Sequence, residues 1–157
     1  MSEANQINLK KEKLKLDHIQ QFYLSCNKDT KIDFVKDIID SCKTKTQTII
    51  FVNSRKFAEI LFNRLKGEEY PVTLIFGGME NKERDEMIEK FRKGERTIVI
   101  TTDLLSRGFD MPEIKLVINF DVPFKGNGPD FETYLHRVGR GGRFGSKALA
   151  VTLFDRE

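Results

Sequence analysis

The chain has 157 residues, of which 39% are hydrophobic and 32% are charged. This length and composition are typical of a single folded domain with a sizeable core, and they exclude a disordered chain. The net charge of +3 permits nucleic-acid binding without arguing for it, because 24 acidic residues nearly cancel 27 basic ones.

The cysteines, the histidines and the apolar runs bear on whether the protein binds metal or enters a membrane. Cys26 and Cys42 sit in no ligand spacing, which predicts two reduced thiols, and two histidines are too few for a histidine-rich metal site. We therefore expect no bound metal. The apolar runs fall far short of the roughly 20 residues that span a bilayer. The polar start has no apolar signal segment, so we expect a soluble, intracellular protein without membrane insertion.

Residues 1–15 are polar and lysine-rich, and they predict a flexible lead-in or linker before a domain at 16–157. Residues 18–26 predict an edge strand. After it, apolar residues recur at helical spacing from Thr30, with Thr30 and Asp33 as a capping pair.

Short apolar runs rich in β-branched residues predict five further strands, at 47–52, 72–76, 97–102, 116–120 and 148–154. Amphipathic helices are predicted between them, one from Ser54 to Gly67 and one ending at Gly94. A Gly/Pro loop at 125–130 and a helix to about Arg140 precede the last strand. This alternation implies parallel strands with right-handed crossovers. The predicted fold is an open, mainly parallel α/β sheet with helices on both faces.

Open α/β sheets bind their ligands at the carboxyl ends of the strands. The unusual residues of this sequence fall at such ends. They are Asn53-Ser54-Arg55, Gly77-Gly78 and Thr102-Asp103.

The most informative segment is YLHRVGRGGRFG at 134–145. Arg137, Arg140 and Arg143 are spaced by three, which places them within a limited arc on a helix or tight turn. The glycines between them let a phosphate or another domain approach the backbone, and guanidinium groups suit bidentate phosphate binding. The alternative interpretation is a solvated basic helix end, which would rarely need three interleaved glycines.

Three other segments carry weaker signals. The Thr102 hydroxyl can bond a phosphate and Asp110 can accept from ribose, although an ordinary loop salt bridge explains 101–112 equally well. Ser54 reads as a helix N-cap, or as part of an anion site beside Arg55. Arg84 reads as a surface arginine paired with neighbouring glutamates, or as a functional residue behind two glycines.

In combination these segments resemble the C-terminal domain of DEAD-box RNA helicases over roughly residues 16–155. IIFVNSR is similar to motif IV, GGMENKER to motif IVa, TTDLLSRGFD to motif V, LVINFD to motif Va and YLHRVGRGGRFG to motif VI. The resemblance implies a RecA-like sheet of the P-loop NTPase type. In motif IVa, Asn81 stands where the family usually has a longer glutamine.

The resemblance also implies roles for single residues. In that family ATP binds between two RecA-like domains and RNA lies across both. Arg140 and Arg143 would be arginine fingers for the γ-phosphate, and Asp110 and Gly108 would face the ATP ribose and backbone. The residues implied to hold the RNA backbone are Ser54, Gly78, Arg84 and Thr102. Those implied to contact the other domain are Arg107, His136 and Arg137.

The loop at 124–133 is longer than the usual connection there and is similar to helicases that remodel messenger RNA–protein complexes at the nuclear pore (the Dbp-five type). This resemblance implies a role in mRNA export, in cytoplasm and nucleus and at the nuclear pore. It also implies a nuclear-export activator with an inositol polyphosphate and a nucleoporin as partners, beside RNA and the protein's own N-terminal domain. We expect a monomer.

The sequence contains no GxxxxGK[ST] phosphate loop and no Asp-Glu-Ala-Asp tetrad. We therefore expect a fragment of a larger two-domain enzyme that is inactive alone, with Mg²⁺ held mainly by the N-terminal domain. Two alternatives remain open. One is a non-catalytic RNA-binding or partner-binding module, and the other is the second domain of another superfamily-two helicase acting on DNA.

Overall fold

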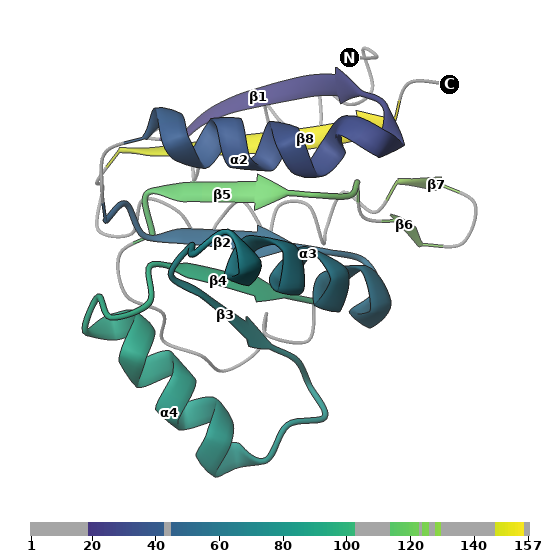
Figure 1. The fold of residues 1–157 in the computed structure, drawn as a ribbon. Helices are drawn as coiled ribbons and strands as arrows, with labels where there is room; N and C mark the ends of the chain where they lie inside the picture. The colour runs from purple at the N-terminus through teal and green to yellow at the C-terminus, as the bar shows by residue number, and fades with distance from the viewer. Residues whose placement is uncertain are drawn as a thin grey trace.

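The computed structural model describes residues 19–42, 45–102, 114–122, 124–125, 128–129 and 147–155. Within these ranges six strands form one sheet in the order β1-β8-β5-β2-β4-β3 (Figure 1), and every neighbouring pair is parallel. This confirms the predicted open, parallel α/β sheet. The strands are β1 (Ile19–Cys26), β2 (Thr48–Phe51), β3 (Val72–Ile75), β4 (Ile98–Thr101), β5 (Leu116–Asn119) and β8 (Ala148–Asp155).

Helices cover both faces of the sheet, as predicted. They are η1 (Lys28–Thr30), α2 (Lys31–Ser41), α3 (Arg55–Gly67) and α4 (Asn81–Arg92). Successive strand residues point to opposite faces, so each buried strand supplies two separate hydrophobic clusters. Ile49 and Phe51 of β2 pack with Phe91 of α4 on one face. Ile50 packs with residues of α2 and α3 on the other face.

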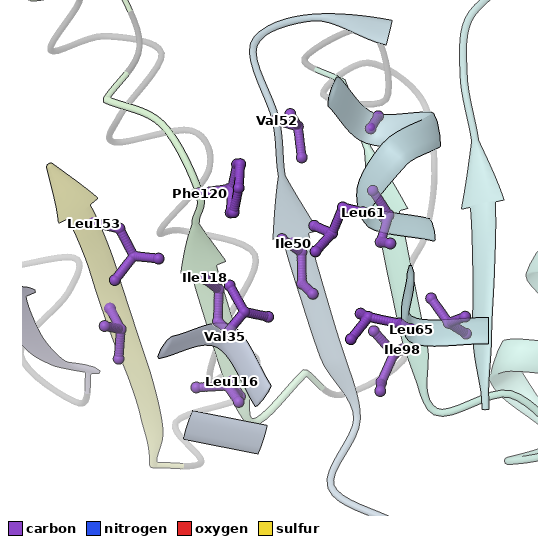
Figure 2. Packing of buried hydrophobic residues seen from close by; sticks show 14 of the residues in the cluster. Val35, Ile50, Val52, Leu61, Leu65, Ile98, Leu116, Ile118, Phe120 and Leu153 are labelled. Carbon is purple, nitrogen blue, oxygen red and sulfur yellow. The ribbon is translucent and has the colours of Figure 1, made fainter. Parts of the chain in front are cut away.

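The cluster beneath α2 and α3 is the larger of these two (Figure 2). Val35 of α2 lies over Ile118 of β5, and Leu61 of α3 lies beside Ile50 of β2. All four side chains are at most 1% exposed. Their burial fixes α3 against the sheet, and with it the position of the residues at the start of α3.

The edge strand predicted near the N-terminus is β1, which pairs only with β8 in the described sheet. Its register runs from Ile19 opposite Ala148 to Cys26 opposite Asp155. The first and last described segments of the chain therefore lie side by side (Figure 1). Cys26 and Cys42 are free thiols, in agreement with the sequence analysis.

Two local predictions were wrong. Thr30 and Asp33 do not form a capping pair, because the Thr30 side chain caps no α2 amide. Its hydroxyl donates instead to the Asn27 carbonyl at 3.1 Å, since the 3₁₀ turn η1 runs directly into α2. The segment predicted as a Gly/Pro loop contains a two-stranded antiparallel ribbon formed by β6 (Phe124–Lys125) and β7 (Gly128–Pro129).

The predicted start of α3 and the predicted end of α4 are confirmed. Ser54 caps α3, where its side chain accepts from the Phe57 amide. Gly94 follows α4 with φ of 80°, a left-handed conformation that glycine adopts without steric cost. The predicted linker at 1–15 and the predicted helix to about Arg140 lie outside the described residues. Among the described helices, none is long and apolar enough to cross a membrane.

Candidate functional site

The carboxyl ends of β2, β4 and β3 meet at one edge of the sheet, because these strands are neighbours and parallel. Ser54 follows β2, Thr102 directly follows β4, and Gly78 follows β3. The structure thus brings together three of the four residues that the sequence analysis assigned to one nucleic-acid backbone. Arg84, the fourth, lies in the first turn of α4, which begins just after Gly78.

Ser54 has a defined structural role in this edge. Its Oγ accepts a hydrogen bond from the Phe57 amide at 3.2 Å, and its carbonyl accepts from the Ala58 amide at 3.0 Å. The N-cap interpretation is therefore correct. The cap uses the hydroxyl oxygen as acceptor, so the hydroxyl proton remains able to donate to an anion, and the start of α3 carries a partial positive charge.

Arg55 extends from the start of α3 to the residue that follows β3. Its guanidinium carbon lies 3.8 Å from the centroid of the Phe76 ring, and its Nε donates to Glu59 Oε1 at 3.2 Å. Because β4 lies between β2 and β3, the Arg55 side chain passes the end of β4. The stacking and the ion pair hold one positive charge between the segments that carry Ser54 and Gly78.

Gly78 is not required by the backbone. Its φ lies outside the left-handed region, and a Cβ there would lie 3.9 Å from Arg55 Nη1 and from two Phe76 ring carbons, which are ordinary contact distances. An alanine would therefore fit within the protein. A glycine at this position leaves the Arg55 guanidinium and the main chain open to a ligand.

Arg84 is held by its neighbour on the same helix. Its Nη2 donates to Asn81 Oδ1 at 2.6 Å. Asn81 thus supplies a hydrogen bond to Arg84, although its side chain is shorter than the glutamine usual in the resembled motif. Arg84 is half-buried in the first turn of α4, where the Asn81 amide oxygen fixes its guanidinium, a group suited to binding phosphate.

Sequence reasoning missed two residues that shape this edge. Phe76 provides the surface for Arg55, and Asp121 accepts from the Asn53 amide at 2.9 Å through Oδ2. The available signal was position, because Phe76 is the last residue of the strand predicted at 72–76 and Asp121 follows the strand predicted at 116–120. A search restricted to hydroxyl groups, glycines and arginines passes over an aromatic ring and a single carboxylate.

The residues predicted to face ATP or the other domain lie outside the described residues. They are Arg107, Gly108, Asp110, His136, Arg137, Arg140 and Arg143. Among the described residues, no three His, Cys, Asp or Glu side chains are grouped so that they could hold a metal ion.

The described groups are a hydroxyl, an open main-chain segment and two fixed guanidinium groups. Such groups suit sugar–phosphate contacts, which position a strand without reading its sequence. Fold and site together define an open, parallel α/β domain with a candidate nucleic-acid backbone site at the carboxyl ends of its strands.

Comparison with known proteins agrees with this class. Residues 30–145 match the family described as helicase conserved C-terminal domain. The chain is 43% identical over 152 residues to eukaryotic initiation factor 4A of Dictyostelium discoideum. That alignment covers 96% of this chain and 36% of the Dictyostelium protein.

Solved structures of DEAD-box proteins have the same fold. The C-terminal domain of Dbp5 superposes with a TM-score of 0.82 at 37% identity, covering 90% of this chain and 79% of that domain. Saccharomyces cerevisiae Dbp5 bound to RNA and ADP BeF3 gives 0.82 at 38% identity, covering 90% of this chain and 36% of the yeast chain. Escherichia coli SrmB gives 0.78 at 30% identity, covering 87% of this chain and 78% of that one.

The chain belongs to the helicase conserved C-terminal domain family, as the C-terminal RecA-like domain of a DEAD-box protein. Its structural similarity to Dbp5 supports the predicted resemblance to the Dbp-five type. The chain spans only 36% of the length of the Dictyostelium relative.

Proposed function

We propose that this chain is the second domain of an ATP-dependent RNA helicase. It binds the RNA strand and completes the ATP site that it shares with the N-terminal domain. Ser54, Gly78 and Thr102 contact the RNA sugar–phosphate backbone, and Arg84 contacts a phosphate. The observation that carries this proposal is the convergence of Ser54, Gly78 and Thr102 at one sheet edge, with Arg55 stacked on Phe76 between them.

The second part of the proposal concerns ATP. The N-terminal domain of the whole protein binds ATP and holds most of the Mg²⁺ coordination. Arg140 and Arg143 reach the γ-phosphate from this half, where fixed positive charges stabilise the charge that develops in phosphoryl transfer. Asp110 accepts from the ribose, and Gly108 allows a close backbone approach. Yeast Dbp5 solved with RNA and ADP BeF3 supports this assignment by similarity.

The two halves work together through contacts between the domains. We assign these contacts to Arg107, His136 and Arg137. Because the phosphate loop and the Asp-Glu-Ala-Asp tetrad are missing from these 157 residues, the isolated chain has no RNA-stimulated ATPase activity. It acts as a monomer on single-stranded RNA and on messenger RNA–protein complexes.

The finer part of the proposal is a role in mRNA export, in cytoplasm and nucleus and at the nuclear pore. The long 124–133 connection and the structural similarity to Dbp5 support it. Yeast Dbp5 has been solved bound to Gle1 with IP6, and with Nup159. By similarity, an export activator with an inositol polyphosphate and a nucleoporin are the partners to test first.

The RNA contact is tested with a pair of arginines on the same helix. Arg84 lies in the first turn of α4, and Arg92 lies in its last turn, where it pairs with Glu89. R84A and R92A remove the same charge. We expect R84A to weaken binding to an oligouridine RNA and to reduce the slope of log affinity against log salt by about 0.7, one single-strand phosphate contact. R92A should leave the slope unchanged. Equal slopes for R84A and R92A would contradict the assignment.

Two further measurements address the wider proposal. Purified 1–157 is assayed for ATP turnover with and without RNA, and then again with the matching N-terminal domain added. Turnover by the chain alone, after a control for contaminating ATPases, would refute the ATP part. Affinities for single-stranded RNA and single-stranded DNA across one salt series separate an RNA helicase from a DNA helicase, because the DEAD-box assignment requires the RNA to bind more tightly.

A further inference from the structure

The buried charge at the start of α2 is the feature that the proposed function does not explain. The Lys31 side chain is 7% exposed, and its Nζ lies 3.0 Å from Asp121 Oδ1 and 3.3 Å from Asp155 Oδ1. It also lies 4.9 Å above the centroid of the Phe120 ring. Among the described residues it is the one charged residue that is buried.

Two physical arguments oppose a lysine at this position. Lys31 is the first residue of α2, and a positive charge at a helix N-terminus is unfavourable to the helix dipole. Burial of an ammonium group also carries a desolvation penalty. The two carboxylates compensate for both effects, but an apolar residue at this position would have avoided both. The stability of α2 alone therefore does not explain the lysine.

The Asp121 carboxylate connects Lys31 to the candidate RNA site. Its Oδ1 accepts from Lys31, and its Oδ2 accepts from the Asn53 amide at 2.9 Å. Asn53 is also held by its side chain, where Nδ2 donates to the Val122 carbonyl at 2.8 Å. Asn53 directly precedes Ser54. The ends of β8, β5 and β2 and the start of α2 are thus tied together at the edge where Ser54 lies (Figure 1).

We propose that Lys31 and Asp121 are a positioning pair that fixes the connection between β2 and α3. Ser54 and Arg55 are thereby held in the RNA-binding arrangement before the RNA backbone binds. This inference rests on the proposed RNA contact of Ser54. Lys31 does not touch the RNA. It holds Asp121 in one orientation, and Asp121 holds the Asn53 amide.

Five variants separate positioning from general stability. The relay is the chain of contacts from Lys31 through Asp121 to the Asn53 amide. K31M and D121A break it. D121N keeps an oxygen that can accept from the Asn53 amide but loses the charge. K36M is the matched control, because Lys36 lies on the same helix and pairs with Glu68 and Asp33 away from this edge. V35A removes buried volume from the same helix and serves as the control for lost stability.

Two readouts are taken on each variant at a temperature where all are folded. One is the hydrogen-exchange rate of the Asn53 amide without RNA, and the other is the affinity for an oligouridine RNA. We expect K31M and D121A to speed Asn53 exchange and to weaken RNA binding about tenfold, the effect of losing one charge-assisted hydrogen bond. D121N should give intermediate values for both. K36M and V35A should leave the Asn53 exchange rate, after correction for global unfolding, and the RNA affinity unchanged.

The outcomes distinguish this inference from the proposed function. If K31M leaves Asn53 exchange unchanged, or if V35A weakens RNA binding as much as K31M does, the positioning role is refuted. If D121A cannot be purified folded, D121N and K31M still decide the question. If S54A and R84A leave RNA binding unchanged while K31M still speeds Asn53 exchange, the RNA assignment fails and the relay stands as a purely structural clamp.

Discussion

The Arg55 guanidinium stacks on the Phe76 ring with 3.8 Å between its central carbon and the ring centroid. These residues are separated by a complete helix and strand in sequence, yet they meet because β2 and β3 both flank β4. The contact places a positive charge between the segments that carry Ser54 and Gly78.

The ring should therefore orient the arginine for RNA. F76L keeps apolar bulk but removes the π face, and we expect RNA affinity to fall about two- to fivefold, the value of an exposed cation–π contact. Fluorescence anisotropy with a labelled oligouridine measures it. F22L serves as the control. Phe22 is an exposed residue of β1, the outer strand at the side of the sheet farthest from β3. If R55A weakens binding while F76L does not, the arginine acts without the ring.

Gly78 should be needed by the ligand and not by the fold. G78A places a methyl group at ordinary contact distance from Arg55 and Phe76, so the free energy of unfolding should stay within about 1 kcal/mol of wild type. RNA affinity should fall at least about threefold, because the methyl group occupies the approach to the main chain. G67A, at the end of α3 with nothing within 4 Å, should leave RNA affinity unchanged and raise the free energy of unfolding by no more than about 1 kcal/mol. A large loss of stability in G78A would show that the glycine serves the fold.

A buried polar pair joins β5 to β8. Asn119 Nδ2 donates to Thr152 Oγ1 at 3.0 Å, the two residues are opposite each other in the register, and both are at most 2% exposed. T152V removes the acceptor and should cost about 1–3 kcal/mol, because it leaves the amide donor buried without it. The double variant N119L/T152V should recover most of this loss. Urea unfolding of wild type, T152V, N119L and the double variant measures all four proteins of this cycle, and strictly additive effects would contradict the coupling.

Tyr70 should make stability depend on pH in the alkaline range. Burial and the hydrogen bond from its hydroxyl to Asp40 raise the pKa of Tyr70 to about 12, from the ordinary value of 10.0. The folded state therefore retains the proton that the unfolded state releases first. The stabilisation is fully present below pH 10 and is lost as the pH rises toward 12.

Comparison of wild type with Y70F over this range isolates the effect, since Y70F lacks the group that titrates. We expect the difference in unfolding free energy to be constant below pH 10 and to shrink above it. D40N should lower the pKa of Tyr70. Because the chain has three tyrosines, the Tyr70 titration is obtained from tyrosinate absorbance as the difference from the matching Y70F protein. An unchanged tyrosinate titration in D40N would remove Asp40 as a cause of the shift.

Local sequence determined the elements and the end of the sheet at which the site lies. The β-branched run at 47–52 is apolar on both faces of a strand, so it had to be a buried strand in a sheet covered on both sides, and Ser54 had to follow its carboxyl end. The same reasoning placed Gly78 and Thr102, because parallel strands joined by crossovers bring their carboxyl ends to one edge.

Tertiary structure alone decided which side chains meet at that edge. Strand order cannot be read from local pattern, and the order β5-β2-β4-β3 is what allows Asp121 to reach Asn53 and Arg55 to reach Phe76. Lys31 looked like an ordinary helix residue in the sequence. It became a buried charge held by two carboxylates only because α2 begins where β5 and β8 end. Periodicity records which face of an element is apolar, whereas an ion pair between residues 90 positions apart depends on how the elements pack.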